Sequence, residues 1–89
     1  KILLMSPPHL GDNLVDIPSG EEMGFERGIS YSKRLAPIYE DWAKFHNIEF
    51  LDAAKYANPS EIDACHLTRE SHRKLGKMVA KKCKEILEI

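Results

Sequence analysis

Two short hydrophobic runs stand apart from longer stretches in which hydrophobic residues recur at helical spacing. The first run, Ile2 to Met5, is continuously apolar and is followed by Pro7 and Pro8. Such a run predicts a strand buried on both faces, as in a parallel sheet covered by helices. The second run, Ile48 to Asp52, predicts another short strand with faces of mixed character.

Helical spacing is found between the two predicted strands and again at the end of the chain. The first stripe repeats at intervals of four, three, four and three residues and predicts a helix from about Ser30 to His46. Its members, which we expect in a core or an interface, are Tyr31, Leu35, Ile38, Trp42 and Phe45. The second stripe follows Thr68, a good N-cap. Its members are His72, Leu75, Gly76, Val79, Cys83 and Ile86.

Three residues within these patterns have special backbone requirements. Pro37 either kinks the first helix or marks its true first turn, because proline lacks the N–H and its ring crowds the preceding turn. Asn47 is expected to close that helix in a left-handed conformation. Gly76, on the predicted buried stripe of the last helix, would permit close approach to a sheet.

Residues 7–28 are rich in Gly, Pro, Asp and Glu and show no clear period. They predict a long connection with room for a short helical turn. Structureless loops of this length are uncommon, and those that occur often bind ligands or act as lids. A mobile surface loop explains the composition equally well, so both interpretations stay open.

The order strand, helix, strand, helix predicts an α/β fold with a parallel sheet and right-handed crossovers. Two strands are too few, because the apolar strand Ile2 to Met5 would keep an unpaired edge and an uncovered face. We therefore expect residues 1–89 to be a fragment of a single domain, whose sheet is completed by upstream sequence, by a complementary chain or by strand exchange in a homo-oligomer.

Composition excludes several classes of partner. The 89 residues are 43% hydrophobic and 30% charged, which is typical of a soluble globular protein, and their formal net charge is −1. No global field would draw the chain to nucleic acid or to an anionic membrane, and no apolar run is long enough to span a bilayer. The two cysteines, Cys65 and Cys83, form no C-x-x-C pair and are most simply free thiols.

Asp63 and His66 stand three residues apart in a turn that precedes the last helix. At this spacing the carboxylate can accept a hydrogen bond from the imidazole Nδ1–H, which leaves the other ring nitrogen free to act as a base. An imidazole, with an ordinary pKa of about 6.5, suits proton transfer near neutral pH. A carboxylate that holds its tautomer is the third member of a Ser-His-Asp triad. Taken by spacing alone, the pair is better explained by helix capping or by a surface ion pair.

The surrounding sequence resembles the final conserved block of the SGNH (GDSL-like) hydrolases. Residues Asp63 to Thr68 read Asp-Ala-Cys-His-Leu-Thr, similar to the Asp-x-x-His-Leu-Thr block of that family, and Glu70 and His72 follow in the helix as its members have them. Ile2 to Pro8 resembles the fourth strand and the proline pair of the arylesterase branch. The helix and strand between Tyr31 and Ala53 also fit its layout, so the resemblance covers nearly the whole chain.

This resemblance implies a flavodoxin-like three-layer α/β/α sandwich, of which the chain is the C-terminal part. It implies hydrolysis of small, short-acyl or acetyl esters through an acyl-enzyme, with Asp63 orienting His66 and His66 activating a serine. The family's Gly-Asp-Ser block, its glycine N–H and its asparagine have no counterpart here. The remaining candidates for the nucleophile, Ser6, Ser30, Ser32 and Ser60, lack that context. We therefore expect the isolated chain to be inactive.

Five residues are candidates for contacts with the ester substrate: Pro8, His9, Met23, Phe25 and Cys65. His9 follows the proline pair at the carboxyl end of a predicted parallel strand, where ligands bind in open α/β sheets. A solvated loop histidine is the alternative. Met23 and Phe25 form either an acyl-binding wall or an anchor for the loop. Cys65 adjoins His66, but neighbours in sequence rarely direct their side chains together, so a cysteine nucleophile is not expected.

No metal or other cofactor is expected, because the four histidines show no recognised ligand spacing. Basic residues on the outer face of the last helix are best explained as a solvated face near a helix C-terminus. The rival to the esterase hypothesis is a non-catalytic interaction or structural module whose surfaces include the loop from His9 to Arg27.

Overall fold

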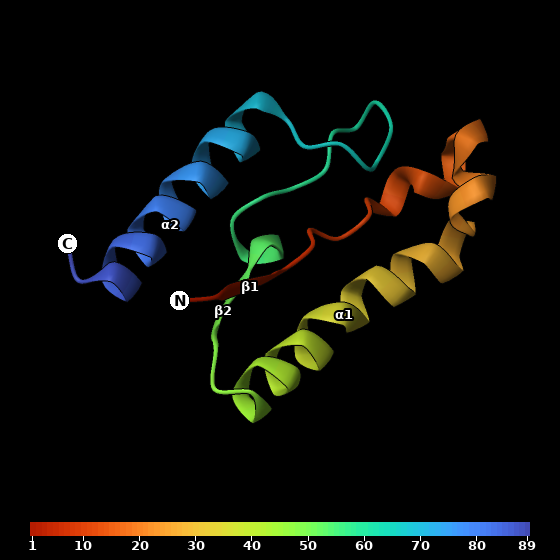
Figure 1. Cartoon of the computed structure of the whole chain (residues 1–89). Coiled ribbons are helices and arrows are strands. Elements are labelled where there is room, and N and C mark those ends of the chain that lie inside the picture. The colour runs from red at the N-terminus through yellow and green to blue at the C-terminus, as the bar shows by residue number, and fades with distance from the viewer.

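The computed structural model describes the whole chain, residues 1–89, as a thin slab measuring 45 × 29 × 15 Å. Strands β1 (Leu3–Ser6) and β2 (Glu49–Asp52) lie between helices α1 (Phe25–Phe45) and α2 (Arg69–Leu87) (Figure 1). The strands are parallel and in register from the pair Leu3 and Glu49 to the pair Ser6 and Asp52. The predicted α/β class and the parallel β-α-β-α order are therefore confirmed.

The connection from β1 to α1 is more ordered than the sequence predicts. It contains two 3₁₀ helices, η1 (Asp12–Asp16) and η2 (Pro18–Met23). Leu14 of η1 is fully buried, and Lys33 of α1 forms an ion pair with Asp12 at 3.1 Å. The predicted long connection is therefore present with two short helical turns in it, but it ends at Gly24, and the predicted boundary at residue 28 is wrong because residues 25–28 belong to α1.

Helix α1 begins at Phe25, five residues before its predicted start. Gly24 adopts the left-handed conformation (φ +81°) that ends η2 and precedes the first turn of α1. Gly28 lies inside the helix, where an added Cβ would stand only 1.9 Å from the carbonyl oxygen of Met23. Sequence composition suggests a loop here, whereas close approach of two backbone segments is the reason for the glycine.

Pro37 lies in the interior of α1, so its interpretation as the first turn of the helix is wrong. The helix continues through it to Phe45. Asn47 follows with φ +53°, which confirms the predicted left-handed closure. Its N–H donates to the carbonyl of Lys44, and the N–H of Ile48 donates to the carbonyl of Ala43 before β2 begins.

The aromatic stripe of α1 is mostly exposed. Ala43 is buried, and Tyr39, one turn away, and Ser32, three turns away, are half-buried on its side of the helix. Leu35 of the stripe is half-buried, but Trp42 and Phe45 are 52% and 85% exposed, and Tyr31 and Ile38 are exposed as well. Of the two predicted places, a core or an interface, the core is wrong within this chain.

The predicted stripe of helix α2 is partly covered. Its apolar members Leu75, Val79, Cys83 and Ile86 are half-buried, whereas His72 and Gly76 are exposed. A Cβ added to Gly76 would have no atom within 4 Å, so the predicted close approach of this glycine to a sheet is wrong. Ion pairing of Lys82 with Glu49 at 3.2 Å joins α2 to β2.

The core is small and is made mostly of small side chains. Only 9 of 89 residues are buried, so much of the apolar surface stays uncovered. The buried hydrophobic residues are Leu14, Ala43, Leu51, Ala53, Ala57 and Ala64. Ser6 is also fully buried, and its hydroxyl donates to Asp52 at 3.1 Å, which satisfies its polar atom inside the sheet.

Candidate active site

The loop between η3 (Ala53–Lys55) and α2 carries the Asp63 and His66 pair. It is closed at its base by a bridge between Pro59 and Leu67 and by the N–H of Ser60, which donates to the carbonyl of His66 at 2.6 Å. The hydroxyl of Ser60 accepts from the N–H of Ile62, as a turn-capping serine does. The loop is therefore a closed turn and not an extended connection.

The carboxylate of Asp63 binds the loop that carries it. Its Oδ1 accepts the backbone N–H groups of Cys65 at 3.0 Å and His66 at 2.9 Å. The N–H of Cys65 above all, then the imidazole and the N–H of His66, lower the pKa of Asp63 to about 2. This side chain is consequently charged at every pH near neutrality.

The imidazole of His66 is oriented by the same carboxylate. Its Nδ1 lies 2.5 Å from Oδ2 of Asp63, which fixes the Nδ1–H tautomer when the ring is neutral. The side chain is 84% exposed, and its Nε2 makes no hydrogen bond within the chain. The geometry expected from the three-residue spacing is therefore formed, with one ring nitrogen held and the other facing solvent.

Residues near the start of the chain support this loop from its inner side. The N–H of Gly11 donates to the carbonyl of Ala64 at 2.8 Å, and the side-chain amide of Asn13 donates to the carbonyl of Glu61 at 2.8 Å. Ala64 is fully buried with φ +58°, a conformation that an alanine adopts only when its surroundings impose it. A Cβ on Gly11 would stand 3.1 Å from that of Ala64.

Sequence reasoning missed Gly11, Asn13 and Ala64. Their role depends on a contact between segments about fifty residues apart, and no local period carries that information. The turn composition of Gly11-Asp12-Asn13 is the only local signal, and it predicts a turn but no partner for it.

The start of α2 fixes the other end of the loop. The hydroxyl of Thr68 accepts the N–H of Ser71 at 3.0 Å, which confirms the predicted N-cap. The hydroxyl of Ser71 accepts the N–H of Asn58 at 2.9 Å, and Ser71 is buried. The first turn of helix α2 and the start of the loop are thereby joined at Ser71, five residues after His66.

Three of the five predicted substrate contacts lie together. Pro8, His9 and Cys65 line one pocket of about 430 Å³ beside the loop. Its other lining residues are Pro7, Leu10, Gly28, Tyr31, Ser32 and Leu35. Met23 and Phe25 do not line this pocket, because Met23 ends η2 and Phe25 starts α1, where its ring lies close to Gly20.

The serines considered from the sequence have other structural roles. Ser6 is buried against Asp52, and the hydroxyl of Ser32 donates to the carbonyl of Ile29 while accepting the N–H of Leu10. Ser60 caps its own turn, and Ser30 lies exposed on α1. No serine hydroxyl bonds to the imidazole of His66 within this chain.

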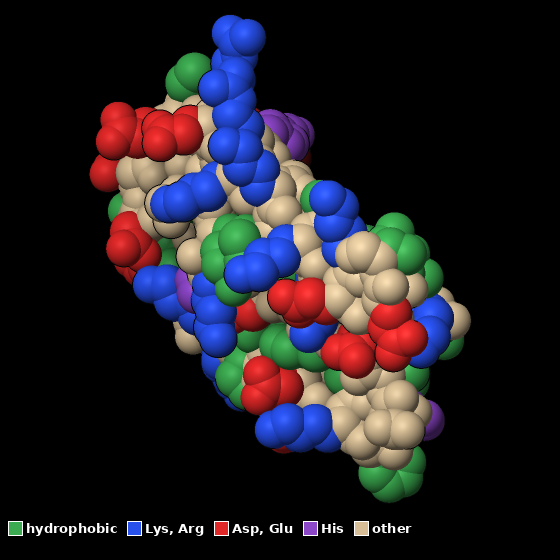
Figure 2. Space-filling model, turned by 90° about the vertical axis from the view of Figure 1, so that its left-hand side faces the viewer, with side chains coloured by type: hydrophobic (Ala, Val, Ile, Leu, Met, Phe, Trp, Pro, Cys, Tyr) green, Lys and Arg blue, Asp and Glu red, His purple; other side chains and the backbone are tan.

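Other chemical groups are sparse. Cys65 and Cys83 are free and half-buried. No three His, Cys, Asp or Glu side chains come together in a way that could hold a metal ion, and neither α1 nor α2 combines the length and apolarity needed to cross a membrane. Figure 2 shows the side of the molecule on which α2 lies, where Lys and Arg alternate with Asp and Glu.

Comparison with known proteins shows what this chain is similar to. No family model and no curated protein matches the sequence. Solved structures do match. The chain is similar to a carbohydrate acetylesterase family member from Sinorhizobium meliloti, with 30% identity and a TM-score of 0.85 over 100% of this chain and 40% of that one.

Two further solved structures are similar to the chain. Est24, a carbohydrate acetylesterase from Sinorhizobium meliloti, has 31% identity and a TM-score of 0.81 over 97% of this chain and 39% of its own. The aryl esterase of M. smegmatis has 29% identity and a TM-score of 0.80 over 96% of this chain and 38% of its own.

The chain thus spans about two fifths of the length of the structures that it matches. The predicted resemblance to the C-terminal portion of an arylesterase-like hydrolase is confirmed by these neighbours, and the two-stranded parallel sheet with its flanking helices is the part of the esterase fold that they share with it. The chain therefore resembles, in sequence and in structure, the C-terminal portion of these esterases.

Proposed function

We propose that this chain supplies the aspartate and the histidine of an SGNH-type ester hydrolase. The observation that carries the proposal is the position of His66, whose Nδ1 binds the Asp63 carboxylate while Nε2 faces solvent at the end of a parallel sheet. A base held in one tautomer can take the proton of a serine hydroxyl and return it to the leaving alcohol.

The reaction that fits this arrangement proceeds through an acyl-enzyme. His66 accepts the serine proton as the oxygen attacks the ester carbonyl, then donates it to the departing alkoxide, and a water molecule repeats the sequence to release the acid. Asp63 remains ionised throughout, since its pKa of about 2 is far below neutrality, and it stabilises the imidazolium. This chain contributes neither the nucleophile nor the oxyanion hole, so it is inactive alone.

The pocket beside the loop supports a small ester as substrate. Pro8, His9 and Cys65 line it together with Leu10 and Tyr31, so its wall is largely apolar and suits a short acyl group. The solved neighbours are carbohydrate acetylesterases and an aryl esterase, which favours an acetyl ester. Met23 and Phe25 remain predicted contacts that a mobile η2 segment would have to bring closer.

The test uses a hybrid esterase, in which this chain replaces the matched portion of the Sinorhizobium meliloti carbohydrate acetylesterase. The hybrid should hydrolyse p-nitrophenyl acetate, and His66→Ala should lower kcat by about 10³-fold or more, because little beyond binding and the oxyanion hole then remains. His72→Ala is the matched control, since His72 is exposed on α2, and it should retain kcat within about twofold. Undiminished turnover in the His66→Ala hybrid would reject the assignment.

The competing function is a non-catalytic interaction module that uses the segment from His9 to Arg27. The exposed side chains Val15 and Met23 on η1 and η2 favour it to a limited degree. Under that hypothesis a correctly folded hybrid would show neither ester turnover nor labelling by a serine-directed phosphonate, and the His66→Ala change would alter neither measurement.

A further inference from the structure

Residues 10–14 bind two different parts of the chain in alternation. The N–H of Leu10 donates to the hydroxyl of Ser32 on α1 at 3.0 Å, and Asp12 forms an ion pair with the same helix. Leu14 is fully buried in η1, which packs against α1. The even-numbered residues of this segment therefore attach it to α1.

The odd-numbered residues of the segment bind the loop that carries the candidate catalytic pair. The N–H of Gly11 donates to the carbonyl of Ala64 at 2.8 Å. The side-chain amide of Asn13 donates to the carbonyl of Glu61, also at 2.8 Å. These two carbonyls lie on either side of Asp63 in the sequence. The segment thus joins α1 to the turn from which the carboxylate and the imidazole project.

The same segment borders the pocket beside the loop. Leu10, directly before Gly11, lines the pocket from one side. Cys65, directly after Ala64, is the only lining residue that belongs to the loop, because the others belong to residues 7–10 and to α1. The hydrogen bond between Gly11 and Ala64 therefore helps to set where the loop lies relative to the rest of the pocket.

Gly11 is required by space and not by its backbone conformation. Its φ of −74° and ψ of 147° are open to any residue. A Cβ at this position would stand 2.6 Å from Oδ1 of Asn13 and 3.2 Å from Cγ of Pro59. A larger residue would displace the amide of Asn13 or the loop itself, so the contact between the two segments depends on this glycine.

Hydrogen bonds within the loop hold the catalytic pair together but do not place it. The carboxylate of Asp63 accepts only from groups of Cys65 and His66, which belong to the same loop. Ala64 lies between them with φ +58°, a conformation that persists in a residue with a Cβ only where the surroundings impose it. Those surroundings include Gly11, whose N–H binds the carbonyl of Ala64.

We propose that Asn13 is a positioning residue of the esterase, which together with the N–H of Gly11 keeps Nε2 of His66 at a fixed place beside the pocket. Asn13 acts through the backbone of Glu61. This inference rests on the proposed function, because the place of His66 matters when its ring takes the serine proton. Reacting groups must lie within about 3–3.5 Å of each other and be aligned, so a small displacement of the base slows the chemical step.

Amide hydrogen exchange in the hybrid esterase, read residue by residue by NMR, tests whether Asn13 holds the loop. Asn13→Ala should speed exchange of the Gly11 N–H by about tenfold or more, because the bonds to the loop open together, and should leave the Leu10 N–H within about twofold. Unchanged exchange at Gly11 would overturn the proposal. Equal acceleration at Leu10 and Gly11 would overturn it too, since the whole segment would then have unfolded.

Steady-state kinetics with p-nitrophenyl acetate test the consequence for the base. Asn13→Ala should lower kcat by about 10- to 100-fold and change KM by no more than about threefold, because only one lining residue of the pocket moves with the loop. Asn13→Asp keeps the shape but has no donor for the carbonyl of Glu61, so it should lower kcat at least as much. Full kcat in either variant, or a loss carried by KM alone, would contradict the proposal.

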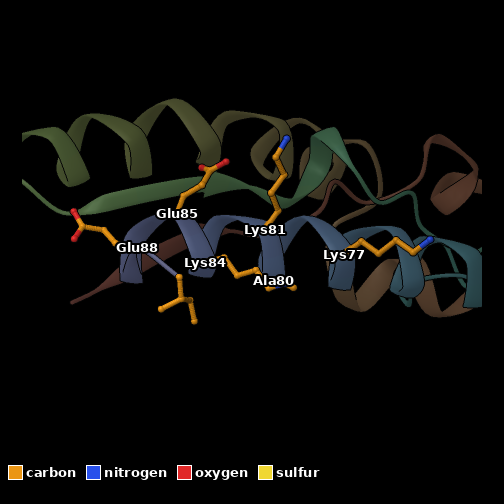
Figure 3. A pocket seen from close by; sticks show the side chains of 7 residues that line it. Lys77, Ala80, Lys81, Lys84, Glu85 and Glu88 are labelled. Carbon is orange, nitrogen blue, oxygen red and sulfur yellow. The ribbon is translucent and has the colours of Figure 1, made fainter.

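Two control variants leave the contacts with the loop intact. Asp12→Ala removes an exposed ion pair one residue away, and because such pairs contribute little it should keep kcat within about twofold. Figure 3 shows Lys77 extending along α2, where it forms no ion pair within the chain. Lys77→Ala should also keep kcat within about twofold. A loss at either control as large as that of Asn13→Ala would indicate a general effect on the fold and overturn the proposal.

The pKa of Asp63 separates displacement of the loop from its collapse. In Asn13→Ala this pKa should stay at about 2, because the groups that lower it belong to Cys65 and His66. A rise to 3.8 would show that Asn13 holds the turn together instead of placing it, and would overturn the proposal. Failure of the proposed function would be seen separately, as undiminished turnover in the His66→Ala hybrid, and hydrogen exchange at Gly11 does not depend on turnover.

Discussion

At the scale of single residues, the negative charge of Asp63 is stabilised by backbone N–H groups of its own loop. Two backbone N–H groups of that loop donate to Oδ1, and only Oδ2 is used to orient His66. The carboxylate therefore organises the loop and the imidazole at the same time. This dual use explains why a spacing of three residues suffices, since the turn that brings His66 into reach is the turn that Asp63 itself closes.

The pKa of Asp63 provides the first test at this scale. Carbon-13 NMR of the carboxyl group should give a midpoint at a pH of about 2, below the ordinary value of 3.8. In His66→Ala the pKa should rise but stay below 3.8, because the N–H of Cys65 is the largest cause of the shift. A return of the pKa to 3.8 would show that the imidazole is the sole cause of the lowered value.

The lowered pKa of Asp63 also makes the stability of the folded chain depend on pH. A carboxyl with a lower pKa in the folded than in the unfolded state contributes stability above the unfolded value, and this contribution is lost as the pH falls. For Asp63 the loss should occur between pH 3.8 and about 2, and Asp63→Asn should remove that part of the acid transition.

The sequence predicted the residues of the candidate site but not the contacts that hold their loop in place. Asp63, His66 and the N-cap Thr68 are local in sequence, so spacing and turn chemistry predicted their arrangement. The contact of Gly11 with Ala64 joins segments distant in sequence, and the positive φ of Ala64 is contrary to the preference of alanine. Neither feature has a local pattern that could have predicted it.

At the scale of elements, α2 connects the loop of Asp63 and His66 to the sheet. Thr68 caps the helix, Ser71 binds back to Asn58, and Lys82 forms an ion pair with Glu49 of β2. The start of the helix is thus fixed to both ends of the loop, and its second half is fixed to the strand. Correct placement of His66 depends on this helix as much as on Asp63.

Thr68→Ala tests the contribution of the cap. Loss of the side-chain acceptor leaves the N–H of Ser71 without its partner and should lower the free energy of unfolding of the hybrid by about 1 kcal/mol, measured by urea denaturation. Thr68→Ser keeps the acceptor and should cost markedly less. If both variants lose the same stability, the hydroxyl of Thr68 does not cap α2.

Element types were predictable from periodicity, whereas element boundaries and faces were not. Strands β1 and β2 and both helices lie where their patterns place them. Helix α1 begins at Phe25, directly after the left-handed Gly24, although the composition of this segment suggests a loop. Trp42 and Gly76 are exposed, so a rule that places every residue of a helical stripe on the sheet side assigned these two positions wrongly.

At the scale of the whole molecule, the chain encloses only a small core. Only 9 of 89 residues are buried, while large side chains such as Ile2, Trp42 and Phe45 are exposed. The expectation that two strands are too few followed from the unpaired edge of an apolar strand. Ile2 and Met5 beside that edge are exposed, whereas charged residues such as Lys55 and Lys82 line the groove along β2.

The proposed function also predicts where the parts of the catalytic site lie. The loop of Asp63 and His66 follows β2, and the pocket lined by Pro8, His9 and Cys65 lies at the carboxyl end of β1. Under that proposal, the nucleophile that completes the triad comes from outside residues 1–89, so activity of the hybrid requires the portion supplied by the Sinorhizobium meliloti enzyme.

The most direct test of the central claim is a double-mutant cycle in the hybrid esterase, measured as kcat for p-nitrophenyl acetate. Asp63→Asn and His66→Ala should each lower kcat by about 10³- to 10⁴-fold, and the double variant should lose no more than His66→Ala alone, because the two side chains act as one unit. Losses that multiply in the double variant, or turnover that survives either single change, would contradict the assignment of Asp63 and His66 as the acid and base partners of an esterase triad.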